Sequence, residues 1–154
     1  MARRIRSTCA VSITLLDLVT NSTAETEAAG EDLGRGLQPG DLLLLAGDLG
    51  AGKTTFVRGV ARGAGSSAHV ASPTFQLVRV YPGRVQVAHV DLYRLEAGAG
   101  LLDLGLEELL DQGAVVVEWG DRLDGSGAQK ATILSIEHLG GDRRRLRMER
   151  AVPR

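Results

Sequence analysis

Runs of apolar residues along the chain predict strands and helices that follow one another in turn. Residues 42–46 are continuously apolar, and so are residues 114–117. Short runs of this kind are typical of strands that are buried on both faces. Residues 25–37 and 53–64 instead repeat their apolar positions at the spacing of a helix. The predicted apolar side of the first helix consists of Ala28, Ala29, Leu33 and Leu37.

Two pairs of β-rich segments predict antiparallel hairpins. Residues 74–81 and 84–90 are separated only by a Pro-Gly pair, a spacing that predicts a tight two-residue turn. Residues 132–139 and 144–148 flank a Gly-Gly-Asp turn. We therefore expect antiparallel strands beside the buried ones, and hence a mixed sheet.

The remaining segments fit the same α/β domain. Residues 12–19 are predicted to be a first strand, and residues 101–110 a short amphipathic helix that Gly105 interrupts. The sequence shows no internal repeat, low-complexity tract or interdomain linker, and its 154 residues suit one compact domain. We expect a single domain over residues 1–154, with its core in residues 12–150.

Charge and composition exclude several classes of protein. The 18 basic and 19 acidic residues give a formal net charge of -1, which argues against wholesale binding of nucleic acid. The single cysteine cannot form an internal disulfide, and no apolar window reaches 18 residues, so we expect a cytoplasmic protein. A basic cluster near the C-terminus is typical of a solvated strand edge, with a contact to tRNA or a partner as the alternative. It consists of Arg143, Arg144, Arg145, Arg147 and Arg150.

The segment after the first buried run carries the most specific motif. Residues 47–54, Gly-Asp-Leu-Gly-Ala-Gly-Lys-Thr, match the Walker A pattern G-x-x-x-x-G-K-[ST] in full. With this composition, about 0.004 chance matches to that pattern are expected in the chain. A predicted strand precedes the loop and a predicted helix follows it, which is the context that nucleotide binding requires. We therefore expect an α/β, three-layer P-loop NTPase fold, with a mixed central sheet flanked by helices.

The residue types of this loop suit the phosphates of a nucleotide. Glycines let backbone N–H groups turn toward the phosphates, and the N-terminus of the following helix adds partial positive charge. Lys53, one of only two lysines in the chain, supplies a point charge to the β- and γ-phosphates, and the Thr54 hydroxyl can bind Mg²⁺. The loop residues expected to bind ATP are Asp48, Leu49, Gly50, Ala51, Gly52, Lys53, Thr54 and Thr55.

Two carboxylates stand at the ends of apolar strands, where ligands of open α/β sheets bind. Asp91 follows residues 85–90, and Glu118 follows residues 114–117. Either residue can serve as the Walker B acid. Residues 72–75, Ser-Pro-Thr-Phe, occupy the place of a switch loop that senses a γ-phosphate, although an ordinary turn explains them equally well.

Five motifs in a specific order and spacing identify a family resemblance. They are residues 47–56, 72–75, 89–95 (His-Val-Asp-Leu-Tyr-Arg-Leu), 105–108 (Gly-Leu-Glu-Glu) and 117–119 (Val-Glu-Trp). Over about residues 23–123, the chain resembles the TsaE (YjeE) family of bacterial P-loop ATPases. That family serves the synthesis of threonylcarbamoyladenosine, a modified base beside the tRNA anticodon.

The resemblance implies a partner-dependent ATPase with a low rate of its own. The implied partners are the TsaB–TsaD complex and, through it, tRNA; the implied ligands are ATP and Mg²⁺. It links Thr54 and Glu118 to Mg²⁺, and we take Asp91 as the acid that positions water. A residue near Thr23 or Thr26 would approach the base side of the nucleotide. The expected catalytic set is Lys53, Asp91 and Glu118.

Three other functions fit a P-loop. A GTPase follows the same order of motifs, but the chain lacks the Asn-Lys-x-Asp tetrad that normally selects guanine. A small-molecule kinase would need an Arg-rich lid, for which Arg94 and Arg122 are weak candidates. A nucleotide sensor that does not hydrolyse its ligand is the third alternative.

Overall fold

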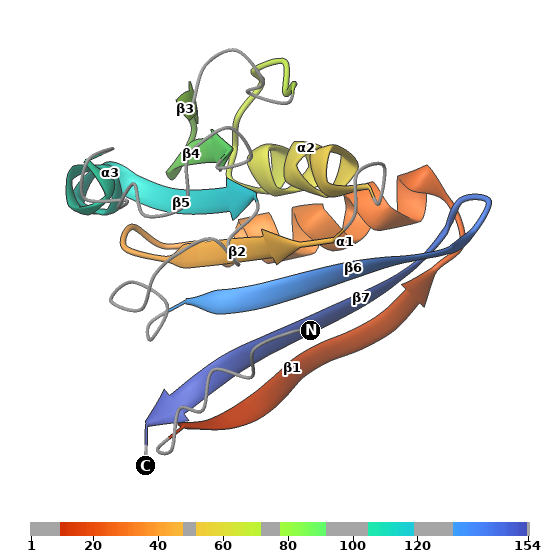
Figure 1. The fold of residues 1–154 in the computed structure, drawn as a ribbon. Helices are drawn as coiled ribbons and strands as arrows, with labels where there is room; N and C mark the ends of the chain where they lie inside the picture. Colours follow the sequence, from red (N-terminus) through yellow and green to blue (C-terminus); the bar gives the residue numbers. More distant parts are fainter. Residues whose placement is uncertain (1–9, 48–51, 72–77, 92–104, 119–130, 154) are drawn as a thin grey trace.

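The computed structural model describes residues 10–47, 52–71, 78–91, 105–118 and 131–153 (Figure 1). Within these residues the chain forms seven strands and three helices. In chain order they are β1 (Ala10–Thr20), α1 (Thr23–Arg35), β2 (Leu42–Ala46), α2 (Lys53–Gly63), β3 (Val78–Tyr81), β4 (Gln86–Asp91), α3 (Leu106–Gln112), β5 (Gly113–Glu118), β6 (Thr132–Gly140) and β7 (Arg143–Pro153). None of these helices is long and apolar enough to cross a membrane.

The described strands form one mixed sheet in the order β1-β7-β6-β2-β5-β4-β3. The central strands β6, β2, β5 and β4 are parallel, while β7, β1 and β3 are antiparallel to the strands that they join. The predicted α/β class and mixed sheet are therefore confirmed. The pairing of the first strand with the last was not predicted, and it extends the sheet with long strands on one side (Figure 1).

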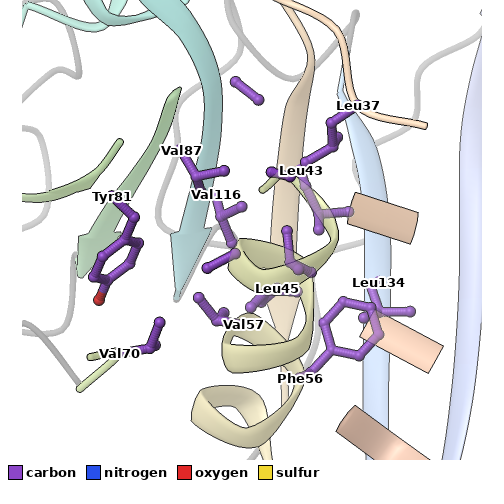
Figure 2. Close-up of a cluster of buried hydrophobic side chains, with 14 of the residues drawn as sticks. Leu37, Leu43, Leu45, Phe56, Val57, Val70, Tyr81, Val87, Val116 and Leu134 are labelled. Carbon is purple, nitrogen blue, oxygen red and sulfur yellow. The ribbon is translucent and has the colours of Figure 1, made fainter. Parts of the chain in front are cut away.

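Each face of the sheet carries its own hydrophobic cluster. On one face Leu45 of β2 belongs to the same cluster as Phe56 of α2 (Figure 2). On the opposite face Leu44 shares a cluster with Leu106 of α3. The continuously apolar strands β2 and β5 lie between these clusters, and all six residues of β5 are buried. This arrangement confirms strands that are buried on both faces, with helices on either side.

Helices α1 and α2 are packed with their backbones almost in contact. A Cβ added at Gly59 would lie under 3.0 Å from the carbonyl oxygen of Glu27, and one at Gly34 would overlap the carbonyl oxygen of Val60 in the same way. Real Cβ atoms essentially never come so close to backbone atoms. The glycines at this contact are Gly30 and Gly34 of α1 and Gly59 and Gly63 of α2. Their lack of a side chain therefore sets the distance between the two helices.

This glycine contact corrects the prediction for α1. The helix spans Thr23–Arg35 rather than residues 25–37, and Ala28 on its predicted apolar side is exposed. Ala29 and Leu33 are only partly buried against the main cluster. The buried residues of α1 are instead Thr26, Gly30 and Gly34. Leu37, which lies just beyond the helix, is buried in the main cluster, so the predicted apolar side is confirmed in part. The most deeply buried face of α1 is nevertheless the one that packs on α2 through glycines.

The connection between β3 and β4 is also longer than the predicted two-residue turn. It spans residues 82–85, and residues 74–77 of the first predicted strand lie outside the described residues. Arg84 donates three hydrogen bonds to backbone carbonyl oxygens at the C-terminal end of α1, at 3.0–3.3 Å. The N–H of Val85 donates to the carbonyl oxygen of Ala64, just after α2. Because these contacts hold the connection against both helices, it does not close as a tight hairpin.

The second predicted hairpin is present as β6 and β7. Gly105, however, precedes α3 as its N-cap instead of interrupting a longer helix. Its φ of 72° lies in the left-handed region, which favours glycine. Residues 101–104, which were predicted to be the start of this helix, lie outside the described residues.

Candidate nucleotide-binding site

The N-terminus of α2 is open to an anion. Its N-cap, Gly52, has a left-handed φ of 100° and provides no side-chain hydrogen bond, and the first turn contains no acidic residue. The first N–H groups of a helix have no partner within the helix, and they carry its positive partial charge. This end of α2 therefore offers the donors and the charge that a phosphate needs. Residues 48–51 of the predicted loop lie outside the described residues.

Lys53 is held at this end of the helix. It is the first residue of α2, it is only 6% exposed, and its Nζ donates a hydrogen bond to the carbonyl oxygen of Gly47 at 2.8 Å. Gly47 follows β2 directly, so the bond joins the end of the strand to the start of the helix. An ammonium group has three hydrogen-bond donors, so Lys53 can make more than this one bond. Thr54 and Thr55 follow in the first turn and are half-buried.

The two predicted acids lie side by side at the ends of parallel strands. Asp91 of β4 is in register with Glu118 of β5, and Glu118 is in register with Leu45 of β2. Residues in register across parallel strands face the same side of the sheet, and Leu45 faces α2. Both carboxylates are buried, with Asp91 8% and Glu118 4% exposed. The structure thus brings both acids to the sheet edge from which Lys53 and α2 begin.

A chain of hydrogen-bond contacts connects Glu118 to two buried residues of neighbouring strands. His89, which is fully buried, places its Nε2 3.0 Å from Oε2 of Glu118. The Nδ1 of His89 lies 3.2 Å from the hydroxyl of Tyr81, which donates to the carbonyl oxygen of Ala71 at 3.1 Å. Burial raises the pKa of Tyr81 above its ordinary value, so the hydroxyl keeps its proton. Glu118 is therefore held in place by a buried neighbour.

A small pocket lies beside Gly52, on the side of α1. It has a volume of about 20 Å³, and its lining consists of Thr23, Thr26, Gly52, Thr55, Asp142 and Arg144. A Cβ added at Gly52 would lie 3.4 Å from Nε of Arg144, so the arginine side chain passes next to the loop. Thr26 is fixed by a 2.6 Å hydrogen bond between its hydroxyl and that of Thr20. The structure thus places Thr23, expected near the nucleotide base, beside the end of the phosphate loop.

The donors at this site suit Mg²⁺ and a nucleotide. The Thr54 hydroxyl and the carboxylates of Asp91 and Glu118 are oxygen ligands, which Mg²⁺ prefers. Within the described ranges, no three His, Cys, Asp or Glu side chains gather into a metal cluster. Mg²⁺ at nucleotide sites usually takes one or two protein oxygens and completes its shell with phosphate and water. The oxygen donors of Thr54, Asp91 and Glu118 therefore fit Mg²⁺ that arrives with a nucleotide.

Comparison with known proteins identifies the family. The family model described as "Threonylcarbamoyl adenosine biosynthesis protein TsaE" matches residues 20–147. The chain belongs to the TsaE family. Proteins of this family take part in the biosynthesis of threonylcarbamoyladenosine in tRNA.

Individual TsaE proteins match over most of their length. The protein from Streptomyces coelicolor is 42% identical over 127 residues, which are 80% of this chain and 78% of the relative. The protein from Treponema pallidum is 36% identical over 129 residues, covering 83% of this chain and 96% of the relative. The crystal structure of YdiB from Bacillus subtilis is similar, with a TM-score of 0.71 and 31% identity over 92% of this chain and 86% of that one.

Sequence reasoning missed three residues at this TsaE site. His89 stands two positions before Asp91, and strand alternation places both side chains on one face, so it could have been found. Tyr81 and Arg144 come from strands on opposite sides of the sheet, and only tertiary structure brings them to His89 and Gly52. The predicted switch segment, residues 72–75, lies outside the described residues.

Other arginines of β7 are balanced by nearby acids. Arg145 donates two hydrogen bonds to Asp17 of β1, at 2.8 and 3.0 Å, and these bonds hold the pKa of Asp17 below its ordinary value. Arg147 forms an ion pair with Glu149 at 3.1 Å. These pairs favour the solvated strand edge over a tRNA-binding patch.

Proposed function

We propose that this TsaE protein binds and hydrolyses ATP with Mg²⁺, and that it acts with the TsaB–TsaD complex in the threonylcarbamoylation of tRNA. The observation that carries the proposal is the convergence of Lys53, Asp91 and Glu118 beside the open N-terminus of α2. An ammonium group, two carboxylates and the N–H groups of a helix N-terminus are the parts that phosphoryl transfer needs. Membership of the TsaE family supports the link to tRNA modification.

Each residue is proposed to have a separate role. Lys53 binds the β- and γ-phosphates, and the N–H groups of the first turn of α2 add hydrogen bonds to them. Thr54 and Glu118 hold Mg²⁺, which when bound neutralises charge on the phosphate oxygens. Asp91, in register beside Glu118, positions the attacking water. Lys53 thus binds the phosphates, Glu118 helps to hold the metal ion, and Asp91 orients the water.

The pocket beside Gly52 is proposed to contact the nucleotide beyond its phosphates. Thr23 can offer a hydroxyl, and Arg144 can offer the planar face and donors of its guanidinium group. Both residues come from outside the phosphate loop, from the start of α1 and from the start of β7. Binding of ATP would therefore tie three separate segments together.

Exchange of Lys53 tests the binding role. Lys53→Ala removes a buried charge from its phosphate partner, and such losses cost on the order of 100-fold in affinity. Lys130→Ala, which removes the other lysine of the chain, is the matched control and is expected to bind ATP like the unchanged protein. The measurement is ATP affinity by calorimetry, with folding checked by thermal melting. Equal ATP affinity in the folded Lys53→Ala protein would overturn the assignment.

Steady-state phosphate release tests the partner. We expect slow turnover by the isolated chain and at least about a tenfold increase when both TsaB and TsaD are added, because P-loop ATPases and GTPases gain far more from partner groups. Omitting either protein should abolish the increase. Fast turnover by the chain alone, dependent on a small-molecule acceptor, would instead support a kinase.

A further inference from the structure

The carboxylate of Glu118 is connected to a buried row of polar groups that runs across three strands. From Glu118 on β5 the row passes to His89 on β4, then to Tyr81 at the end of β3, and ends at the backbone carbonyl of Ala71. Glu118, His89 and Tyr81 are 4%, 0% and 2% exposed. A buried polar side chain needs partners of this kind, so stability alone could account for the row.

The geometry at Glu118 points to more than stability. The bond from His89 engages Oε2, and it fixes the rotation of the carboxylate plane about its last bond. That rotation decides where Oε1 points. The residue stands at the sheet edge beside Asp91, where a ligand oxygen must be aimed within a fraction of an ångström to be useful.

Tyr81 holds the other side of the His89 ring. Its hydroxyl donates to the carbonyl oxygen of Ala71, and the same oxygen lies 3.2 Å from Nδ1 of His89. With Nε2 at Glu118 and Nδ1 at Tyr81, the ring is held at both nitrogens, which fixes its orientation. Removing a residue that hydrogen-bonds to a metal ligand typically lowers metal affinity 10–100-fold.

We propose that His89 is a positioning residue for Glu118, and that Tyr81 keeps His89 in the orientation that this role requires. The inference rests on the proposed function, because it takes Glu118 as a ligand of Mg²⁺ that arrives with the nucleotide. It adds two residues that contact neither the nucleotide nor the metal.

The test compares Mg²⁺ dependence among variants of the full chain. Tyr81→Phe removes one oxygen atom and keeps the ring, and His89→Leu removes both ring nitrogens. His89→Gln keeps an N–H donor near the place of Nε2. The readout is the binding of a fluorescent ADP analogue, measured without metal and over a series of Mg²⁺ concentrations. Glu118→Gln sets the effect of losing the ligand itself, and His69→Gln, at an exposed position, is the control.

We expect Tyr81→Phe and His89→Leu to raise the half-saturating Mg²⁺ concentration about tenfold, with ADP affinity in the absence of metal unchanged. His89→Gln should recover most of that loss.

Two results would overturn the proposal. If Tyr81→Phe and His89→Leu lower the melting temperature but keep Mg²⁺ half-saturation within twofold of the unchanged protein, the row serves only stability. If His89→Leu does not fold, Tyr81→Phe decides alone by the same criterion. ADP binding that is indifferent to Mg²⁺ in the unchanged protein would overturn the proposed function, and this inference with it.

Discussion

Helices α1 and α2 lie beside each other and run in the same direction, yet their N-termini differ. Glu27 of α1 lies against Gly59 of α2, and Glu31 lies one turn further on against Gly63, so both helices begin at the same end. Thr23 and Thr55, from the two first turns, line one small pocket there. Two helix dipoles therefore present their positive ends side by side.

The start of α1 is capped by side chains. The Ser22 hydroxyl accepts a hydrogen bond from the N–H of Glu25 at 3.1 Å, and the Glu25 carboxylate accepts one from the N–H of Asn21 at 2.6 Å. This arrangement is close to a capping box, and its carboxylate offsets the positive end of the helix. The start of α2 has a glycine cap, no acid and a lysine. Of these two N-termini, the one of α2 has no side-chain cap and no acidic residue in its first turn, so it is the one that suits an anionic ligand.

The glycine contact that holds these two ends together gives the largest expected effect. In Gly59→Ala the new methyl group would overlap the backbone of α1 at Glu27, and neither backbone can give way without moving a helix. We expect a loss of about 3 kcal/mol in the free energy of unfolding, even though alanine favours helices. Thermal melting should show a decrease of roughly ten degrees.

Gly36→Ala is the matched control for this prediction. Gly36 has an ordinary φ of -93°, and a Cβ there would lie 3.7 Å from the nearest atom, the Leu33 carbonyl oxygen. We expect a change below about 1 kcal/mol. Equal stability of the two variants would show that the helices can separate at little cost.

Much of this comparison was accessible from the sequence, but not all of it. The phosphate loop, the buried strands and the acids at their ends follow local rules of spacing and polarity, so Lys53, Asp91 and Glu118 could be named in advance. The side-chain cap of α1 also follows a local pattern, since Ser22 and Glu25 stand three residues apart at the start of the helix.

The rest depended on tertiary contacts that no local pattern contains. Gly30 and Gly34 give no apolar signal, so the face of α1 that is most deeply packed could not be predicted by hydrophobicity. Arg84 was not expected to bond to the end of α1, about fifty residues earlier, and this contact changed the turn length. Arg144 belongs to a strand whose other arginines are exposed to solvent. The sequence pattern therefore does not distinguish it as the arginine that lies beside Gly52.

An acidic residue added to the first turn of α2 tests whether the N-terminus of this helix attracts phosphate. Thr55→Glu places an acid in the third position of α2, where α1 has Glu25. The carboxylate offsets the positive end of α2 and repels phosphate, so we expect ATP affinity to fall about tenfold, or 1.4 kcal/mol. Thr55→Gln has the same shape without the charge and is the control. If both variants lose affinity equally, bulk rather than charge is responsible.

The smallest expected effect comes from removing the N-cap side chain of α1. Ser22→Ala removes the hydroxyl that caps the N–H of Glu25, and the loss of such a cap typically costs about 1 kcal/mol. Ser22→Asp restores an acceptor at the same position and should recover most of the stability. Chemical denaturation of the three proteins measures the difference, because a cap alters the midpoint and not the surface exposed on unfolding. If Ser22→Asp is as destabilising as Ser22→Ala, the serine contributes by packing, and the N-terminus of α1 is capped by Glu25 alone.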